Sequence, residues 1–454
     1  MDVSVHPPPV PSIRAEVASV STGHRLRGIT TRQNYWHKGY RYPWESAYTG
    51  IEVTQPCCPD VAEYEQHISG CIAFAARQYL ATTRNEDWLK HGGCSLVTHI
   101  ADFWASRAVI NYTTGLYDIG NVMGPDEDHR NITNSVFTNV VAGYSLYLAQ
   151  YVACLCKSYF LAKDPESWAD IAWSLALPYD EELDYHPQFS GYSRGEQIKQ
   201  ADAVLLGFPL QYPMNTSTRA NDLSYYEGVT RGSGPAMTWS MHTVGHLQLG
   251  DTGQANAMFN KSYEDYVREP FKVWSELRRP KIGAANFFTG MGGFLQALVF
   301  GYGGIRIHLD HLLIDKPQLP PDTSGFTIRG LKYLGANLTL DIQETQSTLS
   351  VAAVDDNWPL TYHDGRNQIR LAAGVSNLSS DEDQFEEEEW QEMETNGATA
   401  SMKSIVDVGT TSSSLSEPAM IVDCVSKVPL EEDEGYFNTY AHFGIHYDML
   451  SDKS

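Results

Sequence analysis

The sequence lacks any long apolar run. No stretch approaches the roughly 20 residues that a membrane-spanning helix needs, so no membrane partner is expected. The first 33 residues contain no apolar segment of the kind found in secretory signals, so no signal peptide is predicted. An internal repeat of fixed period is also missing.

Regular cysteine spacing is missing as well. Seven cysteines are scattered along the chain, and an odd, irregular set favours free thiols in a reducing compartment over a disulfide framework. The sequence therefore predicts a cytoplasmic location. Six Asn-x-Ser/Thr sequons favour the opposite conclusion; they start at Asn111, Asn131, Asn215, Asn260, Asn337 and Asn377.

Basic residues are few. The formal net charge is −24, with 32 Lys and Arg against 56 Asp and Glu. Residues 376–454 hold 18 Asp and Glu against three Lys, a net charge of −15, which leaves −9 for residues 1–375. The acidity therefore belongs mainly to the C-terminal tail. It also excludes nucleic acid as an expected partner, because phosphates would be repelled.

From about residue 55 to 301 the pattern is helical. One apolar stripe has the 3.6-residue period of a helix and consists of Val97, Ile100, Ala101, Trp104 and Ala108. Residues 136–155 form a second such segment, with Asn131 or Thr133 expected as its N-cap. Shorter helices are expected near 165–176, 217–228, 235–248, 252–266 and 289–300. Helical hairpins joined by long, aromatic loops suit an α/α toroid that carries its chemistry at the mouth.

After residue 304 the period changes to two. Apolar and polar residues alternate as in half-buried strands, at Phe326, Ile328, Leu338, Leu340, Ile342, Leu349 and Val351. The sequence thus predicts a mainly α chain with four parts. Residues 1–34 are unassigned, 35–304 form the helical part, 305–375 form a small antiparallel β-unit, and 376–454 form an acidic disordered tail.

Two acids stand in glycine- and aromatic-rich loops about 150 residues apart. Glu127 ends the run Gly124-Pro125-Asp126-Glu127, and Glu276 ends Phe271-Lys272-Val273-Trp274-Ser275-Glu276. Paired carboxyls suit cleavage of a glycosidic bond, where one protonates the leaving oxygen and the other activates water. Read from the residues alone, either acid could also be an ordinary solvated surface acid.

The sequence around these acids resembles glycoside hydrolase family sixty-five, and most closely its branch of glucosidases acting on glucosylgalactosyl-hydroxylysine. Matching segments keep the order and approximate spacing of the family from about residue 35 to 305. They are Tyr42 to Ala47, Met123 to Glu127, Asn134 to Asn139, Ile198 to Asp202, Gly234 to Met241 and Phe271 to Gly293. The resemblance implies an (α/α)6 barrel capped by a C-terminal β-layer, and inversion at the anomeric carbon.

Position by position, the resemblance assigns Glu127 as proton donor and Glu276 as general base. It assigns Lys199 and Gln200 to binding of the glucosyl unit, although the pair could instead cap a helix. The expected partner is a glucosyl disaccharide, possibly on hydroxylysine, and no metal or organic cofactor is needed. Phosphorylases of the family have a phosphate-binding loop where Glu276 stands, so an acid there favours water as nucleophile.

The sequence departs from the family in two places. An earlier barrel segment and the preceding β-sandwich have no counterpart here, so the barrel is expected to be partial. Leu277-Arg278-Arg279-Pro280-Lys281 replaces the small, polar loop that usually follows the base.

The segment Glu431 to His446 is similar to the start of type I protein arginine methyltransferases. Two alternatives to hydrolysis stay open: a disaccharide phosphorylase of the same fold, and an inactive remnant or binding module.

Overall fold

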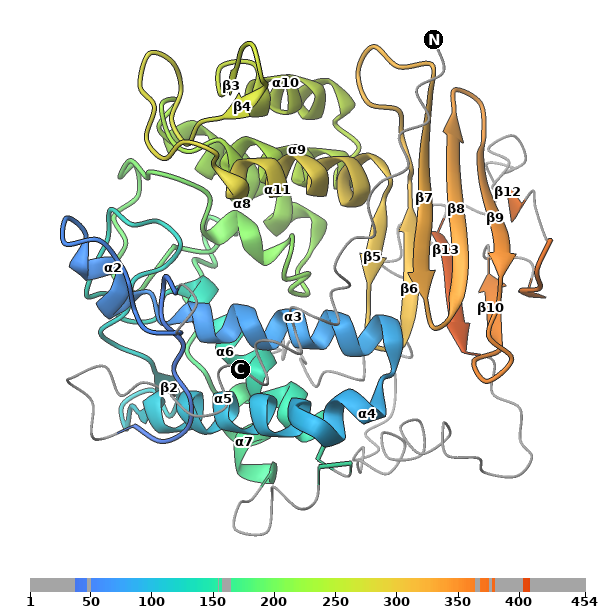
Figure 1. Cartoon of the computed structure of the whole chain (residues 1–454). Helices are drawn as coiled ribbons and strands as arrows, with labels where there is room; N and C mark the ends of the chain where they lie inside the picture. The colour runs from blue at the N-terminus through green and yellow to red at the C-terminus, as the bar shows by residue number, and fades with distance from the viewer. Residues whose placement is uncertain are drawn as a thin grey trace, which may run out of the picture.

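The chain folds into two tiers of helices flanked on one side by a stack of strands (Figure 1). The computed structural model describes residues 37–46, 50–153, 155–156, 165–363, 368–374, 378–379 and 403–408. Residues 1–34 and the methyltransferase-like segment lie outside the described residues. No helix among the described residues is both long and apolar enough to cross a membrane.

The helices follow the periodicity of the sequence. They are α2 (Pro59–Tyr64), α3 (His67–Thr83), α4 (Glu86–Trp88), α5 (Cys94–Arg107), α6 (Val136–Tyr151), α7 (Pro165–Trp173), α8 (Thr216–Val229), α9 (Met237–Gln248), α10 (Thr252–Tyr263) and α11 (Phe288–Gln296). Single turns η1 (Leu89–Gly93), η3 (Ala203–Leu206) and η4 (Ala297–Tyr302) lie between or beside them. The expected helices are therefore confirmed, with small differences at their ends.

The N-cap expected for one helix is wrong. The helix predicted over 136–155 begins at Val136, so neither Asn131 nor Thr133 is close enough to cap it. Ser135 takes that place, and its side-chain oxygen accepts a hydrogen bond from the backbone N–H of Thr138.

The helices pack around two central members. In one tier α6 contacts α3, α5 and α7, and in the other α9 contacts α8, α10 and α11 (Figure 1). Most of α6 is buried because it is apolar on all sides. Trp104 on α5 and Trp239 on α9 are fully buried, one in each tier. The long loops that join the helices carry the polar residues described below.

The β-unit consists of two antiparallel sheets. One has the order β11-β10-β13-β6-β5 and the other β12-β9-β8-β7. The strands are β5 (Ile305–Ile307), β6 (His311–Asp315), β7 (Gly325–Tyr333), β8 (Ala336–Gln343), β9 (Ser347–Ala353), β10 (Leu360–His363), β11 (Gln368–Arg370), β12 (Leu378–Ser379) and β13 (Lys403–Val408). Two small hairpins, β1 (Val109–Ile110) with β2 (Tyr117–Asp118) and β3 (Val267–Arg268) with β4 (Val273–Trp274), lie in the helical part. The period of two after residue 304 is confirmed.

Strand β13 falls inside the segment that the sequence assigns to a disordered tail. Its backbone pairs with β6 on one side and β10 on the other, which places it in the middle of a sheet. The expectation of a tail without structure is therefore wrong for these six residues. Its sequence Lys-Ser-Ile-Val-Asp-Val is rich in β-branched residues, which favour strands even within an acidic surrounding.

The β-unit is joined directly to the helical tiers. The backbone N–H of Leu334 donates to Thr82 O at the end of α3, with a distance of 2.8 Å. The N–H of Gln318 donates to Tyr302 O over 2.7 Å, and the guanidinium of Arg84 donates to Leu309 O. Val299 and Phe300 of η4 pack against the apolar core between the two sheets. The two parts thus share one interior.

A disulfide links Cys94, the first residue of α5, to Cys156, which follows α6. Their Cα atoms are 5.5 Å apart although 62 positions separate them in sequence. The expectation of free thiols is therefore wrong for this pair, while Cys57, Cys58 and Cys71 are free. Disulfides are rare in a reducing cytosol, so this bond counts against the cytoplasmic location, which stays a prediction.

Candidate active site

Glu127 lies in the loop between β2 and α6, and Gly124 lets the backbone of this loop approach Asp202 closely. A Cβ on Gly124 would overlap the carboxylate of Asp202 and approach the Ser135 side-chain oxygen to 3.0 Å. Because only glycine lets the backbone come this close, the run that sequence analysis singled out is needed to seat the loop. Asp202 in turn accepts a hydrogen bond of 3.0 Å from the backbone N–H of Asp126.

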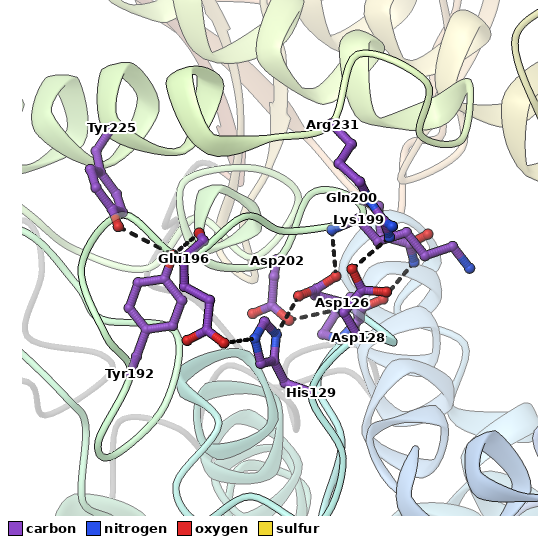
Figure 2. A network of polar contacts seen from close by, with 11 residues as sticks. Asp126, Asp128, His129, Tyr192, Glu196, Lys199, Gln200, Asp202, Tyr225 and Arg231 are labelled. Carbon is purple, nitrogen blue, oxygen red and sulfur yellow. Dashed lines mark hydrogen bonds and ion pairs between the residues drawn. The ribbon is translucent and has the colours of Figure 1, made fainter.

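Asp126 is a fully buried carboxylate at the centre of a polar network (Figure 2). One of its oxygens accepts from the backbone N–H of Lys199 over 2.8 Å. The other lies 2.7 Å from His129 Nδ1. Asp126 therefore joins its own loop to a segment 73 positions later, and it holds the neighbouring Glu127 in place through the backbone.

His129 forms a bridge between two carboxylates. Its Nε2 atom lies 3.0 Å from Glu196, on the side opposite Asp126 (Figure 2). The hydrogen bond to Asp126, assisted by Glu196, raises the pKa of His129 to about 9 against the opposing effect of burial. The imidazolium is thus the form that this network favours near neutral pH. His129 is not among the residues that the sequence assigns to the site.

Glu127 forms an ion pair with Lys199. Glu127 Oε2 and Lys199 Nζ are 2.8 Å apart, with side chains 28% and 21% exposed. The next acid, Asp128, pairs with Arg231 at 2.6 Å and is more exposed. Gln200 donates to the carbonyl oxygen of Pro125, and its own side-chain oxygen has no partner among the described residues.

Glu65 is a further buried acid, close enough to Glu127 for their charges to interact. Glu65 accepts a hydrogen bond from the indole N–H of Trp44, and its other oxygen is buried with no partner in the described part of the chain. Burial, reinforced by the charge of nearby Glu127, raises the pKa of Glu65 to about 9. Glu65 is therefore protonated at neutral pH. Burial likewise is the main reason that the pKa of Asp202 is raised to about 7.

Glu276 lies in the loop after β4. Its backbone carbonyl accepts from the N–H of Ala236 over 3.1 Å, and Glu276 Oε2 accepts from the N–H of Ala284 over 2.9 Å. Gly234, two residues before Ala236, packs so closely on Lys199 that a Cβ would overlap the carbonyl oxygen of Lys199. One turn, residues 234–236, therefore links the loop of Glu276 to the partner of Glu127.

The unusual loop after Glu276 turns away from its carboxylate. Arg278 pairs with Asp265, and Arg279 donates to the carbonyl oxygen of Glu264 over 2.6 Å, both just beyond α10. The aim of Glu276 is set instead by the N–H of Ala284. The large side chains that replace the usual small loop are thus accommodated on the outer side.

The structure places three of the four residues selected from sequence in direct contact around one loop. Glu127 pairs with Lys199, and Gln200 contacts Pro125. Glu276 is connected to Lys199 indirectly, because residues 234–236 contact both. The residues of the network that were not predicted from the sequence are Asp126, His129, Glu196, Asp202 and Arg231. Asp126 and Asp202 could have been found, because each lies in a segment already selected; nothing in the sequence marks Glu196 or Arg231.

The arrangement offers three groups. The carboxyl of Glu127 lies beside the ammonium of Lys199. Glu276 is held by one carboxylate oxygen, and the side-chain oxygen of Gln200 has no partner among the described residues. Such groups can hydrogen-bond sugar hydroxyls and move protons at a glycosidic oxygen. The three acids of residues 126–128 are each already engaged by a cation or an N–H group. A cluster with the composition of a metal site lies elsewhere, on α8 and α9.

The chain is similar in sequence to curated glucosidases. The chain is 42% identical over 352 residues to the protein-glucosylgalactosylhydroxylysine glucosidase of Gallus gallus, covering 76% of this chain and 49% of that protein. It is 44% identical over 343 residues to the glucosidase of the same name from Dictyostelium discoideum, covering 75% of this chain and 47% of the other. The chain thus spans about half the length of the curated relatives it matches.

A solved structure has the same fold. A putative kojibiose phosphorylase from human microbiome superposes with a TM-score of 0.61 at 17% identity, covering 77% of this chain and 54% of the other. The glycosyl hydrolase family 65 central catalytic domain matches residues 27–197, which include Glu127. Residues 27–197 are thus similar to the central catalytic domain of glycosyl hydrolase family 65, and the relatives that are more than 40% identical to this chain are named as glucosidases.

Proposed function

We propose that the chain is an inverting α-glucosidase that releases glucose from a glucosylgalactosyl unit on hydroxylysine. The observation that carries the proposal is the ion pair between Glu127 and Lys199, which stands beside Gln200 in a loop fixed by buried carboxylates. The names of the relatives support the choice of substrate. The two helical tiers would be part of an (α/α)6 barrel closed by the β-unit.

Glu127 would act as the general acid and donate a proton to the glycosidic oxygen. In the free chain its carboxylate is engaged by Lys199 Nζ. The glucosyl hydroxyls must take over that contact before Glu127 can carry and release a proton. Lys199 and the Gln200 side-chain oxygen would then bind the sugar, which couples substrate binding to activation of the acid.

Glu276 would act as the general base. The N–H of Ala284 holds one carboxylate oxygen, and the other has no partner among the described residues, so it can accept a proton from water. Attack of that water on the anomeric carbon breaks the bond to the leaving oxygen, which Glu127 protonates. Inversion requires a carboxyl separation of roughly 6.5–9.5 Å, with the water between Glu276 and the sugar.

The test is turnover of glucosylgalactosyl-hydroxylysine by the purified chain and by Glu127→Gln. Glutamine keeps the shape of the side chain but cannot donate the proton, so activity should fall about 10²- to 10⁴-fold. Asp128→Asn is the matched control, because Asp128 is the adjacent acid and pairs with Arg231 on the outside. Proton NMR of the first product should show β-glucose. Equal turnover by parent and Glu127→Gln would remove Glu127 from its role.

Two other functions remain as outcomes of the same assay. A disaccharide phosphorylase would form glucose 1-phosphate only when phosphate is supplied; the carboxylate of Glu276 speaks against it, because it would repel the anion. A binding module without activity is the second alternative. Thermal stabilisation by glucose without turnover would identify that case.

A further inference from the structure

We infer a site for a divalent transition metal, with zinc as the best fit, between α8 and α9. It consists of Glu227 on α8 and of His242 and His246, which stand one turn apart on α9. The ligand atoms of these three side chains lie within 4.8 Å of one another. Two imidazoles and one carboxylate form a donor set that zinc commonly takes, with water completing the shell.

The strongest sign of a missing ligand is His242. Its side chain is fully buried, and neither ring nitrogen has a hydrogen-bond partner among the described residues. Buried polar groups in native proteins are almost always satisfied, because an unmade hydrogen bond carries the full loss of hydration. A metal bound by His242 and its two neighbours would supply the partner that the protein does not.

The other two candidate ligands contact each other directly, through a hydrogen bond that a bound metal would replace. His246 Nε2 lies 2.7 Å from Glu227 Oε2, and His246 Nδ1 faces Asp251 at 4.0 Å. A carboxylate commonly accepts a hydrogen bond from the second ring nitrogen of a zinc-bound histidine, and Asp251 would have to move closer than 4.0 Å to take that place. Glu227 Oε1 accepts from the side chain of Gln254, which fixes the carboxylate from behind.

The nearby cations are occupied elsewhere. Lys261 Nζ lies 3.3 Å from the ring centroid of Trp239, a cation–π contact. Arg219 donates to Val204 O over 3.1 Å and to the side-chain oxygen of Gln248 over 2.7 Å. Neither side chain forms an ion pair with Glu227 in the part of the chain that the structure describes. The contacts of Glu227 are therefore with His246 and Gln254, and a metal would replace the one with His246.

The site has a structural role in this interpretation. The connection from α8 to α9 holds Arg231, Gly234 and Ala236, which contact Asp128, Lys199 and Glu276, respectively. A metal that joins Glu227 near the end of α8 to α9 would fix both ends of that connection. The metal is thus expected to hold the helix pair in place and to take no part in proton transfer.

The experiment measures zinc bound to the full chain after removal of any purification tag and dialysis against zinc. Elemental analysis should find about one zinc more per chain in the parent than in His242→Leu. Leucine is apolar and of similar size, so it suits a buried position while removing the ligand. Asp251→Asn should bind zinc about 10- to 100-fold more weakly. His91→Ala, at an exposed histidine of η1, is the control and should match the parent.

A second variant and a second measurement keep the test decisive. If His242→Leu does not fold, Glu227→Gln replaces it, since Glu227 is only partly buried. Zinc should raise the melting temperature of the parent and leave that of the variant unchanged. Equal zinc content in parent and variant, or a parent that binds no zinc, would overturn the proposal.

Discussion

Replacing Asp126 by asparagine would test whether the buried network holds the candidate site together. The carboxylate is fully buried and lies 2.7 Å from His129, whose side chain is 13% exposed. Asparagine can still accept from the N–H of Lys199, but it presents an NH₂ group to the His129 ring. The variant therefore removes one buried ion pair and leaves the backbone contact in place.

The expected loss of stability is large at neutral pH. Removing one partner of a buried ion pair costs about 3–5 kcal/mol, and because Glu196 still pairs with His129 the loss should lie at the lower end of that range. The loss should depend on pH in a defined direction. Asp126 is the main cause that raises the pKa of His129 from 6.5 to about 9. Stabilisation by a raised pKa is fully present below pH 6.5 and is lost as pH rises through 9.

Urea unfolding between pH 6 and 9.5 measures both effects. The free energy of unfolding should differ most between parent and Asp126→Asn at the acid end and least at the alkaline end. Asp128→Asn is the control, since the pair of Asp128 and Arg231 is about one third exposed and should be worth about 0–1 kcal/mol. A loss that is equal for both variants, or constant across this range, would refute the assignment of His129 as a charged bridge.

Three further changes have defined outcomes. Cys94→Ser should lower the free energy of unfolding by about 4 kcal/mol, the chain-entropy value for a separation of 62 residues, and reductant should then have no further effect on urea unfolding. The pKa of Glu65 is raised to about 9, so the stability of the parent should fall as pH rises from 4.5 through 9, and urea unfolding of Glu65→Gln should lack that fall. Gly234→Ala should reduce glucosidase turnover because its Cβ overlaps the carbonyl oxygen of Lys199, whereas Gly232→Ala, with open space around it, should keep the turnover of the parent.

The secondary structure was largely predictable from the sequence because it depends on local periodicity. The stripe at Val97, Ile100 and Trp104 is buried within α5, as its 3.6-residue spacing predicts. The alternation at Leu338, Leu340 and Ile342 gives the buried face of β8. In both cases one face of an element must meet the core, and that requirement is visible in a short window of sequence.

The contacts that build the site were not predictable in the same way. The hydrogen bond between Asp126 and Lys199 and the contact between His129 and Glu196 join segments about 70 residues apart. No local pattern records such a pairing. The disulfide of Cys94 escaped prediction for the same reason, and because an odd number of cysteines gives no indication of which two meet.

The predicted boundary between residues 304 and 305 marks a change of sequence pattern. It does not separate two parts that could fold independently. Phe300 lies on the helical side of that boundary and packs into the β-unit, while Leu334 on the other side is hydrogen-bonded to the end of α3. Cutting the polypeptide there would expose apolar surface on both pieces. Swapping the β-unit with that of a relative would therefore require moving η4 and the end of α3 along with it.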